Sequence, residues 1–338
     1  MQKSKPVAHH PLSGKKMVAW LKKYWFMAGL ISVFALTLAD ASGTVSGIGQ
    51  WFKQHYGPDM AIVLIFFFSG LLLEADQIRA GLRDIKGTLT ALSIIFLVSP
   101  ATAILIVMLP LDSGVKMGIF LVAVMPTTLS SGVVMTGAAG GNMAHALVVT
   151  IVSNGLAVFS IPIVLSVLLN MAGKAADITI DKAAIMIKIA GLVLLPLAAG
   201  LVIRYWGRLR SSRLDAKLQL ANQCLILVIV WMALSPAKQA ILNSGVMIGV
   251  IGVLVFVFHG GLLASAGLLS WGLQLGAGRR ESVIFMGGQK TLPLSIILQV
   301  SLFPQYGLAL VVCVVHHIVH LLMDGYVVGW LRTRRGPG

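Results

Sequence analysis

Phe285-Met286-Gly287-Gly288-Gln289-Lys290-Thr291-Leu292-Pro293 carries a lysine in the middle of an apolar stretch, ten residues after Arg280. Ten helical residues advance about 15 Å, which is about half of the hydrocarbon core of a bilayer. A charge at that depth is costly unless it meets a polar cavity or a partner, so Lys290 marks a candidate substrate or ion site. The glycines before it and the proline after it predict a break in the helix, which would free backbone groups to meet a ligand.

The composition predicts an all-α polytopic membrane protein. Hydrophobic residues make up 57% of the 338-residue chain and charged residues only 11%, whereas a soluble domain carries about a quarter charged residues. The net charge of +15 does not indicate a nucleic-acid partner, because the basic residues cluster in short segments between apolar stretches. The partner that this pattern predicts is membrane lipid.

Apolar stretches of membrane-spanning length recur along the chain and predict ten transmembrane helices. We place them at about 25–41, 60–78, 88–109, 115–136, 144–172, 183–206, 218–236, 246–275, 282–301 and 307–330.

The basic residues orient these spans. Of the 26 lysines and arginines, nineteen fall on the side that holds both chain ends, six fall on the other side, and Lys290 is left over. Because basic residues concentrate on the cytoplasmic side, the tails at 1–24 and 331–338 are predicted to be cytoplasmic. The short loops and tails favour a bacterial inner (plasma) membrane.

Four pairs of predicted spans start about 158 residues apart, which indicates two repeats of five spans each. An odd number of spans per repeat inverts the second repeat in the membrane, and paired broken helices in such repeats point to a midplane binding site. The fourth and ninth spans hold matching places, and both contain helix-breaking segments, at 126–132 and 287–293. The alternative is that both are ordinary kinked helices that pack through small residues.

These two segments also carry a family resemblance. The run Pro126-Thr-Thr-Leu-Ser-Ser-Gly-Val-Val-Met-Thr136, followed by Gly140-Gly-Asn142, resembles the fourth-helix motif of the bile acid:sodium symporter family. The run Gly287-Gly-Gln-Lys-Thr-Leu-Pro-Leu294 resembles its ninth-helix motif, in the form typical of the branch similar to member seven of solute carrier family 10. The resemblance covers about residues 20–335.

The resemblance implies a fold of ten helices in two inverted five-helix repeats, in which the broken fourth and ninth helices cross near the membrane centre. A panel domain would comprise 25–86 and 183–240, and a core domain would comprise 87–173 and 246–330. Substrate would bind between panel and core, behind the crossing, and the two domains would move relative to each other in alternating access.

The resemblance also implies an ion site built from side-chain oxygens. Ser130 and Ser131 match the group after the fourth-helix proline, Asn142 and Thr150 match polar positions at the start of the fifth helix, and Gln289 matches a ninth-helix position. Phe285, Ala146 and Ile95 stand where the family pattern would place an acid, a hydroxyl and an amide. These departures make sodium coupling doubtful.

The chain's own charges favour the same conclusion. All eleven acidic residues fall at predicted span ends or in loops, so none is expected at the crossing. We expect the Lys290 ammonium to occupy the place of the bound cation and to donate to the oxygens of Thr128, Ser130 and Ser131, beside Thr291. Because a buried lysine can give up its proton, Lys290 is also a candidate for proton coupling. The alternative is a fixed structural cation with no role in coupling.

Three polar residues of the tenth span share one helix face, because His316, His320 and Asp324 follow four-residue spacing. One interpretation is a proton relay or a metal site, since histidine titrates near neutral pH. The other interpretation is a set of hydrogen-bonded core residues running towards the cytoplasmic end.

Together these observations predict a secondary transporter of an organic, anionic solute. Helix N-termini beside an ammonium favour a small organic anion as substrate. No enzyme motif and no cofactor is expected, and Na⁺ or H⁺ remains open as the coupling ion. The alternative function is a non-transporting membrane regulator that retains the transporter fold.

Overall fold

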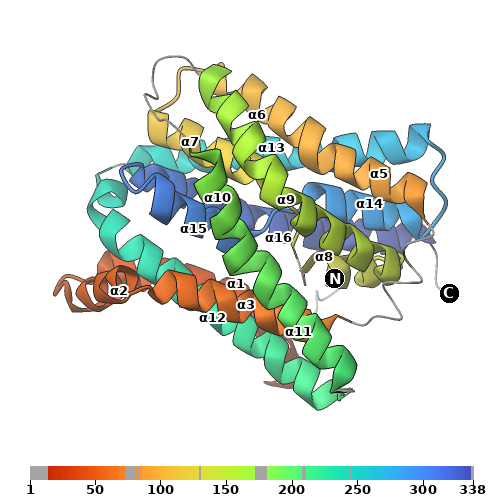
Figure 1. The fold of residues 1–338 in the computed structure, drawn as a ribbon, viewed down its shortest axis with the longest axis horizontal. Coiled ribbons are helices and arrows are strands. Elements are labelled where there is room, and N and C mark those ends of the chain that lie inside the picture. Colours follow the sequence, from red (N-terminus) through yellow and green to blue (C-terminus); the bar gives the residue numbers. More distant parts are fainter. Residues whose placement is uncertain are drawn as a thin grey trace, which may run out of the picture.

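The computed structural model describes residues 14–73, 81, 84–128, 131–171, 181–207, 211–243 and 245–335 (Figure 1). Every regular element within these ranges is a helix, which confirms the predicted all-α class. Several expected features lie outside the described residues: 1–13 of the first tail, 336–338 of the second tail, the end of the predicted second span, and Ser130.

The helices occupy the predicted apolar stretches. In chain order they are α1 (Gly14–Ala39), α2 (Thr44–Gln54), α3 (Gly57–Leu72), α5 (Ile85–Ser93), the π-helix η1 (Ile94–Val98), α6 (Ser99–Val107), α7 (Ser113–Val124), α8 (Ser131–Ala138), α9 (Met143–Met171), α10 (Lys182–Ile189), the π-helix η2 (Ala190–Leu194), α11 (Leu195–Trp206), α12 (Ser212–Leu242), α13 (Gly245–Gly272), α14 (Arg279–Gly288), α15 (Leu292–Leu302) and α16 (Gly307–Arg335).

Several of these helices begin at an aspartate. The carboxylates of Asp84, Asp112 and Asp181 accept hydrogen bonds from backbone N–H groups at the starts of α5, α7 and α10. Such side chains satisfy N–H groups that have no partner inside the helix, which stabilises the helix start by about 1 kcal/mol. The acidic residues at predicted span ends therefore have a local structural role.

One helix was not predicted from the sequence. The chain turns by 110° after α1 and forms the short helix α2 before α3 begins. Gly43 adopts a left-handed conformation at the turn, with φ of 72°. The Asp40 carboxylate accepts hydrogen bonds from the backbone N–H and the hydroxyl of Ser46 and from the Ser42 hydroxyl. These hydrogen bonds favour the charged form of Asp40.

Seven segments of the described chain are helices long and apolar enough to cross a membrane, or eight if the bent pair α1–α2 is one span. Helices α3 and α7 are apolar but shorter. The chain is therefore a multi-pass integral membrane protein, whereas the full set of ten spans stays a prediction.

The helices pack in two neighbourhoods. Helix α12 packs against α1, α2 and α3, and α3 lies along α11. Helix α16 packs against α7, α13 and α15, and α14 packs against α13, α5 and α8. Figure 1 shows the first set along the lower side of the molecule and most of the second set above it.

The contact of α3 with α11 depends on two glycines. A Cβ on Gly70 would lie 2.2 Å from the Leu197 carbonyl oxygen, and one on Gly200 would lie 2.2 Å from the Phe67 carbonyl oxygen. Small residues let helix backbones approach closely in a membrane, where packing replaces the hydrophobic effect as the source of association.

We expect Gly200→Ala to lower the free energy of unfolding by about 1–3 kcal/mol, because the added methyl group must push two backbones apart. The measurement is thermal unfolding of the purified protein in detergent. Gly249→Ala is the matched control, since a Cβ there meets nothing within 4 Å. Equal melting temperatures for the two variants would contradict the tight contact.

Candidate functional site

The candidate site lies where two interrupted helices meet. Helix α7 ends at Val124, and Met125 continues in an extended conformation before α8 begins at Ser131. Helix α14 ends at Gly288, and extended backbone at Gln289 and Thr291 leads into α15. The Thr291 N–H donates to the Pro126 carbonyl oxygen at 3.0 Å and joins the two breaks. Both predicted interruptions are therefore present, and they contact each other.

Lys290 is buried between them, with 2% of its surface exposed. Its Nζ donates to the carbonyl oxygens of Ile95, Ala123 and Met125, at 3.1, 3.2 and 3.0 Å. The expectation that it donates to Thr128, Ser130 and Ser131 is therefore wrong for Thr128 and Ser131, and Ser130 is outside the described residues. The ammonium is held by backbone oxygens of the third and fourth predicted spans.

These three carbonyls are available for physical reasons. In the π-helix η1 the Ser99 N–H donates to Ile94, five residues earlier. The same pattern would pair Ile95 with the N–H of Pro100, which proline does not have. Ala123 and Met125 lie at the C-terminal end of α7, where carbonyls have no intrahelical partner. Ser99 Oγ also donates to the Ala123 oxygen, at 2.8 Å.

The side-chain oxygens of the fourth span bind Gln289 instead. Gln289 Oε1 accepts from Thr128 Oγ1 at 2.6 Å and from Ser131 Oγ at 2.9 Å. Thr128 Oγ1 in turn accepts from the Gly132 N–H at 3.0 Å, at the start of α8. Two lone pairs of the Gln289 oxygen are thereby occupied, so this amide fastens α8 to the break before α15.

A carboxylate reaches the crossing from the tenth predicted span. Gln289 Nε2 donates to Asp324 Oδ2 at 2.6 Å, and Asp324 is fully buried. The expectation that no acidic residue would sit at the crossing is therefore wrong. Its position in the sequence placed Asp324 near the cytoplasmic end of the tenth span. In the structure α16 packs against α7, α8 and α13, and this packing brings the Asp324 side chain to Gln289.

Asp324 connects the crossing to a cluster of buried histidines. Its Oδ1 lies 3.0 Å from His259 Nε2, and its Oδ2 lies 3.5 Å from His320 Nδ1. His320 Nε2 lies 2.8 Å from His317 Nδ1, with donor and acceptor set by the tautomers. The His316 ring stacks on His320, with ring centroids 5.4 Å apart.

This arrangement bears on the two interpretations of His316, His320 and Asp324. The three residues do share a face, and they are joined to His259 of α13 as well as to the crossing. No group of three His, Cys, Asp or Glu side chains within the described ranges is arranged to hold a metal ion. The residues that sequence reasoning did not place here are His259 and the carbonyl of Ile95. His259 was visible only as a polar residue in an apolar span.

Of the remaining predicted site residues, Thr150 lies beside the break after α7 and Asn142 does not. Thr150 Oγ1 lies 3.3 Å from the Thr128 carbonyl oxygen, and Asn154 Nδ2 donates to the Thr127 carbonyl oxygen at 3.3 Å, so α9 supports the break after α7. Asn142 is exposed at the start of α9, where its side chain accepts from the His145 N–H at 3.1 Å.

A second polar cluster joins the starts of α5, α9 and α14. Arg279 pairs with Asp84, and His145 Nε2 lies 3.2 Å from Thr88 Oγ1 and 3.9 Å from Asp84 Oδ2. The Arg279 guanidinium beside Asp84 holds the pKa of that carboxyl below its usual range. This cluster ties the start of α14, the helix that leads to the second break, to α5 and α9.

The crossing concentrates polar and charged groups inside an apolar protein. It brings together a buried ammonium, a buried carboxylate, an amide and two hydroxyls, all held by hydrogen bonds. Buried charges inside membrane helices mark solute or ion pathways.

Comparison with known proteins gives a consistent result. A sequence profile of the SBF-like CPA transporter family matches residues 24–333. The chain is 27% identical over 347 residues to a probable sodium/metabolite cotransporter BASS4, chloroplastic, of Oryza sativa subsp. indica, which covers 97% of this chain and 80% of that protein. It is 28% identical over 339 residues to the protein of that name in Arabidopsis thaliana, covering 94% and 75%. It is 27% identical over 217 residues to sodium/bile acid cotransporter 7 of Xenopus tropicalis, covering 62% and 61%.

We expect Asp324→Asn to lower the free energy of unfolding by about 1–3 kcal/mol. Asparagine has one acceptor oxygen and no charge, whereas the Asp324 carboxylate accepts from Gln289 Nε2 at one oxygen and faces His259 at the other. The measurement is thermal unfolding in detergent. Asp181→Asn is the control, since asparagine also caps a helix start well and Asp181 is exposed. An Asp324→Asn protein as stable as this control would contradict the hydrogen-bond assignment.

Proposed function

Because the chain belongs to the SBF-like CPA transporter family, which comprises membrane transporters and not enzymes, we propose that it is a secondary active transporter of an organic anion that works by alternating access. The observation that carries this proposal is the buried Lys290 at the contact of two interrupted helices. Inverted-repeat transporters bind their solutes beside such breaks.

The proposed architecture has ten spans in two inverted repeats. Seven of these spans are the long apolar segments, and the other three are α1, α3 and the interrupted pair α7–α8. The packing supports a panel of α1, α2, α3, α10, α11 and α12 and a core of the other helices, since most close helix contacts fall within one set. Contacts between the sets include α12 with α16, α10 with α9 and α3 with α15.

The sign of the substrate charge follows from the groups at the breaks. Helices α8 and α15 both begin at the crossing, and helix N-termini carry a partial positive charge. Lys290 adds a full charge whose three recorded partners are neutral carbonyls. The Asp324 carboxylate is 3.0 Å from His259 and bonded to Gln289, so it is engaged on another side of the crossing. This balance favours a small organic anion.

Lys290 also supports a proposal about the coupling ion. Carbonyl oxygens from three backbone positions make a cage suited to a cation, and the ammonium occupies it. A sodium ion at the same place would meet a like charge, so we propose that Lys290 replaces a bound cation here. The names of the relatives, sodium/metabolite cotransporter and sodium/bile acid cotransporter, describe those proteins as sodium-coupled. The proposed difference is that sodium does not bind at the Lys290 position of this chain.

In the proposed orientation both termini lie on the cytoplasmic side of a bacterial inner membrane. Its support is the excess of basic residues on the side of the tails.

The first experiment identifies the substrate. A thermal-shift screen of organic anions, with sodium and pH varied, detects any ligand that binds the folded state, because such a ligand raises the melting temperature. Uptake of each hit into proteoliposomes then separates a transporter from a non-transporting regulator. A ligand that binds but is never accumulated under any ion gradient would overturn the proposed transport function.

We expect uptake to persist when sodium is replaced by choline, and Lys290→Met to reduce uptake at least tenfold, since the three carbonyls lose their partner in a dry site. Lys217→Met is the control, because Lys217 is exposed on α12. A Lys290→Met protein that transports like the control would remove Lys290 from the mechanism. A Lys290→Met protein that gains sodium-dependent uptake would instead support the replacement of a cation by the lysine.

A further inference from the structure

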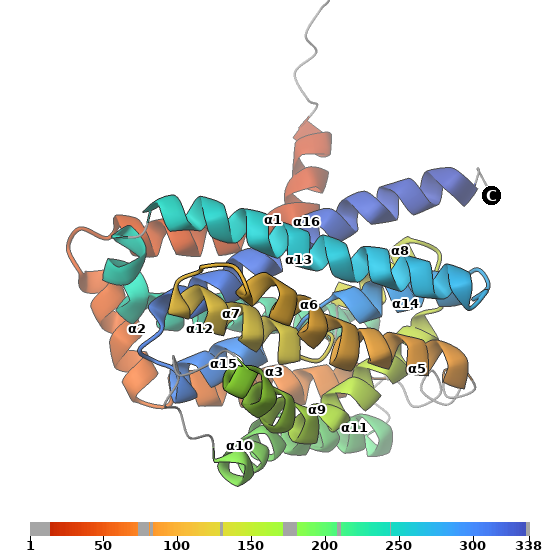
Figure 2. The same cartoon turned by 90° about the horizontal axis from the view of Figure 1, so that it is seen from above.

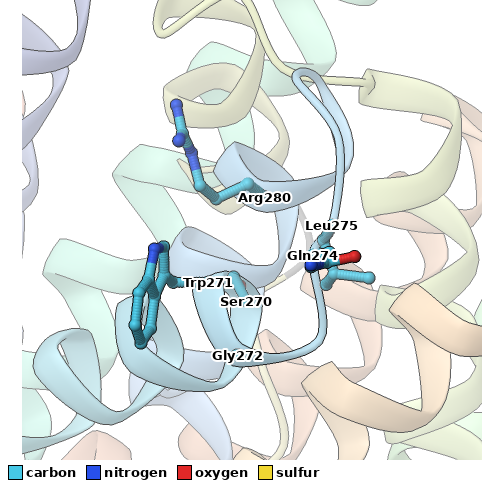
Figure 3. Close-up of a pocket in the computed structure, with 6 residues that line it drawn as sticks. All are labelled: Ser270, Trp271, Gly272, Gln274, Leu275 and Arg280. Atoms are coloured by element: carbon cyan, nitrogen blue, oxygen red, sulfur yellow. The ribbon is translucent and has the colours of Figure 1, made fainter.

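A pocket of about 440 Å³ lies outside the crossing, between the end of α13 and the start of α14 (Figure 3). Its lining comprises Ser270, Trp271, Gly272, Gln274, Leu275 and Arg280. Figure 3 shows Trp271 and Arg280 on one side of the pocket and Gln274 and Leu275 on the loop at the other side. None of these residues contributes to the candidate transport site.

The loop that frames the pocket is built to stop α13 abruptly. The Leu275 N–H donates to the Ser270 carbonyl oxygen at 2.9 Å, and Gln274 adopts a left-handed conformation, with φ of 52°. This is the geometry of a helix end that usually has glycine at the left-handed position. Lys86 Nζ donates to the Leu273 carbonyl oxygen at 2.9 Å, which places a cation at the negative end of the helix.

Two positively charged side chains therefore lie at the pocket. Arg280 extends from the first turn of α14, and Lys86 lies at the end of α13. Arg280 Nη2 donates to Glu281 Oε1 at 3.2 Å. A guanidinium has five N–H groups in a planar fork, so that pair leaves donors for a second anion.

Arg280 is the donor that the pocket offers to a ligand. Ser270 also belongs to the lining, but it is fully buried and its Oγ is not exposed to the pocket. The Arg280 side chain is 44% exposed, and a guanidinium is a donor suited to a phosphate.

The aromatic residues give the depth of the pocket in the membrane. Trp206 ends α11 and Trp271 lies one residue before the end of α13, and both side chains are more than three-quarters exposed. Figure 2 shows the α13–α14 loop at the right-hand end of the molecule, near the start of α5 and the C-terminal end of α16. Tryptophan is enriched at the headgroup level of bilayers, so the pocket lies where phospholipid phosphates are found.

From this geometry we propose that the pocket binds the headgroup phosphate of an anionic phospholipid, with Arg280 as the donor and Trp271 flanking the lipid. The proposal rests on the membrane-spanning arrangement given under the proposed function, but it does not depend on transport. An anionic lipid fits better than a zwitterionic one, because Lys86 and Arg280 both contribute positive charge.

The test is native mass spectrometry of the full-length protein released from detergent after incubation with phosphatidylglycerol or with phosphatidylcholine of the same acyl chains. We expect the wild type to retain phosphatidylglycerol preferentially. Arg280→Gln should weaken that retention about tenfold, as expected for the loss of one charge-assisted contact. Arg280→Lys should keep part of the preference, because the positive charge is retained.

Arg213→Gln is the matched control, since Arg213 is exposed near the start of α12. Equal retention of the two lipids by the wild type would overturn the proposal, as would equal losses in Arg280→Gln and Arg213→Gln. Displacement of the lipid by millimolar inorganic phosphate would show a site for free anions and would overturn the assignment to lipid. Lipid retention needs no transport substrate, so its outcome and that of the uptake experiment are independent.

Discussion

The three hydrogen bonds from the Lys290 ammonium to backbone carbonyls hold the centre of this molecule together. They join a break in the fourth predicted span, a π-helix in the third and a break in the ninth. Each carbonyl would be costly to bury alone, and so would the ammonium. Together they satisfy one another, so the interrupted backbones can persist inside an apolar protein. The breaks and the lysine therefore depend on each other.

A second layer of contacts orients the residues around that centre. Gln289 uses its oxygen to hold Thr128 and Ser131 and its nitrogen to hold Asp324. Asp324 carries the connection to His259 and to the histidines of α16. The hydrogen bonds of Gln289 and Asp324 favour one arrangement, because a shift would leave these buried groups unpaired. These contacts connect the crossing to α13 and α16.

The sequence was sufficient for the elements that depend on local patterns. Long apolar runs located the helices, and the Gly-Gly and Pro residues around Gln289 and after Met125 located the two breaks. The four-residue spacing of His316, His320 and Asp324 placed them on one face correctly. The short helix α2 escaped notice, because its 11 residues are too few and too mixed in polarity to register as a span.

What the sequence determined by itself is the class of the protein and the break beside its lysine, because both follow from local patterns of hydrophobicity, glycine and proline. The partners of that lysine were decided by tertiary structure alone. Backbone carbonyls carry no signature in the sequence, and only the packing of helices shows which of them lie within reach of Nζ. The same holds for Asp324, whose place along its own helix gave no indication of the neighbour that its side chain would meet.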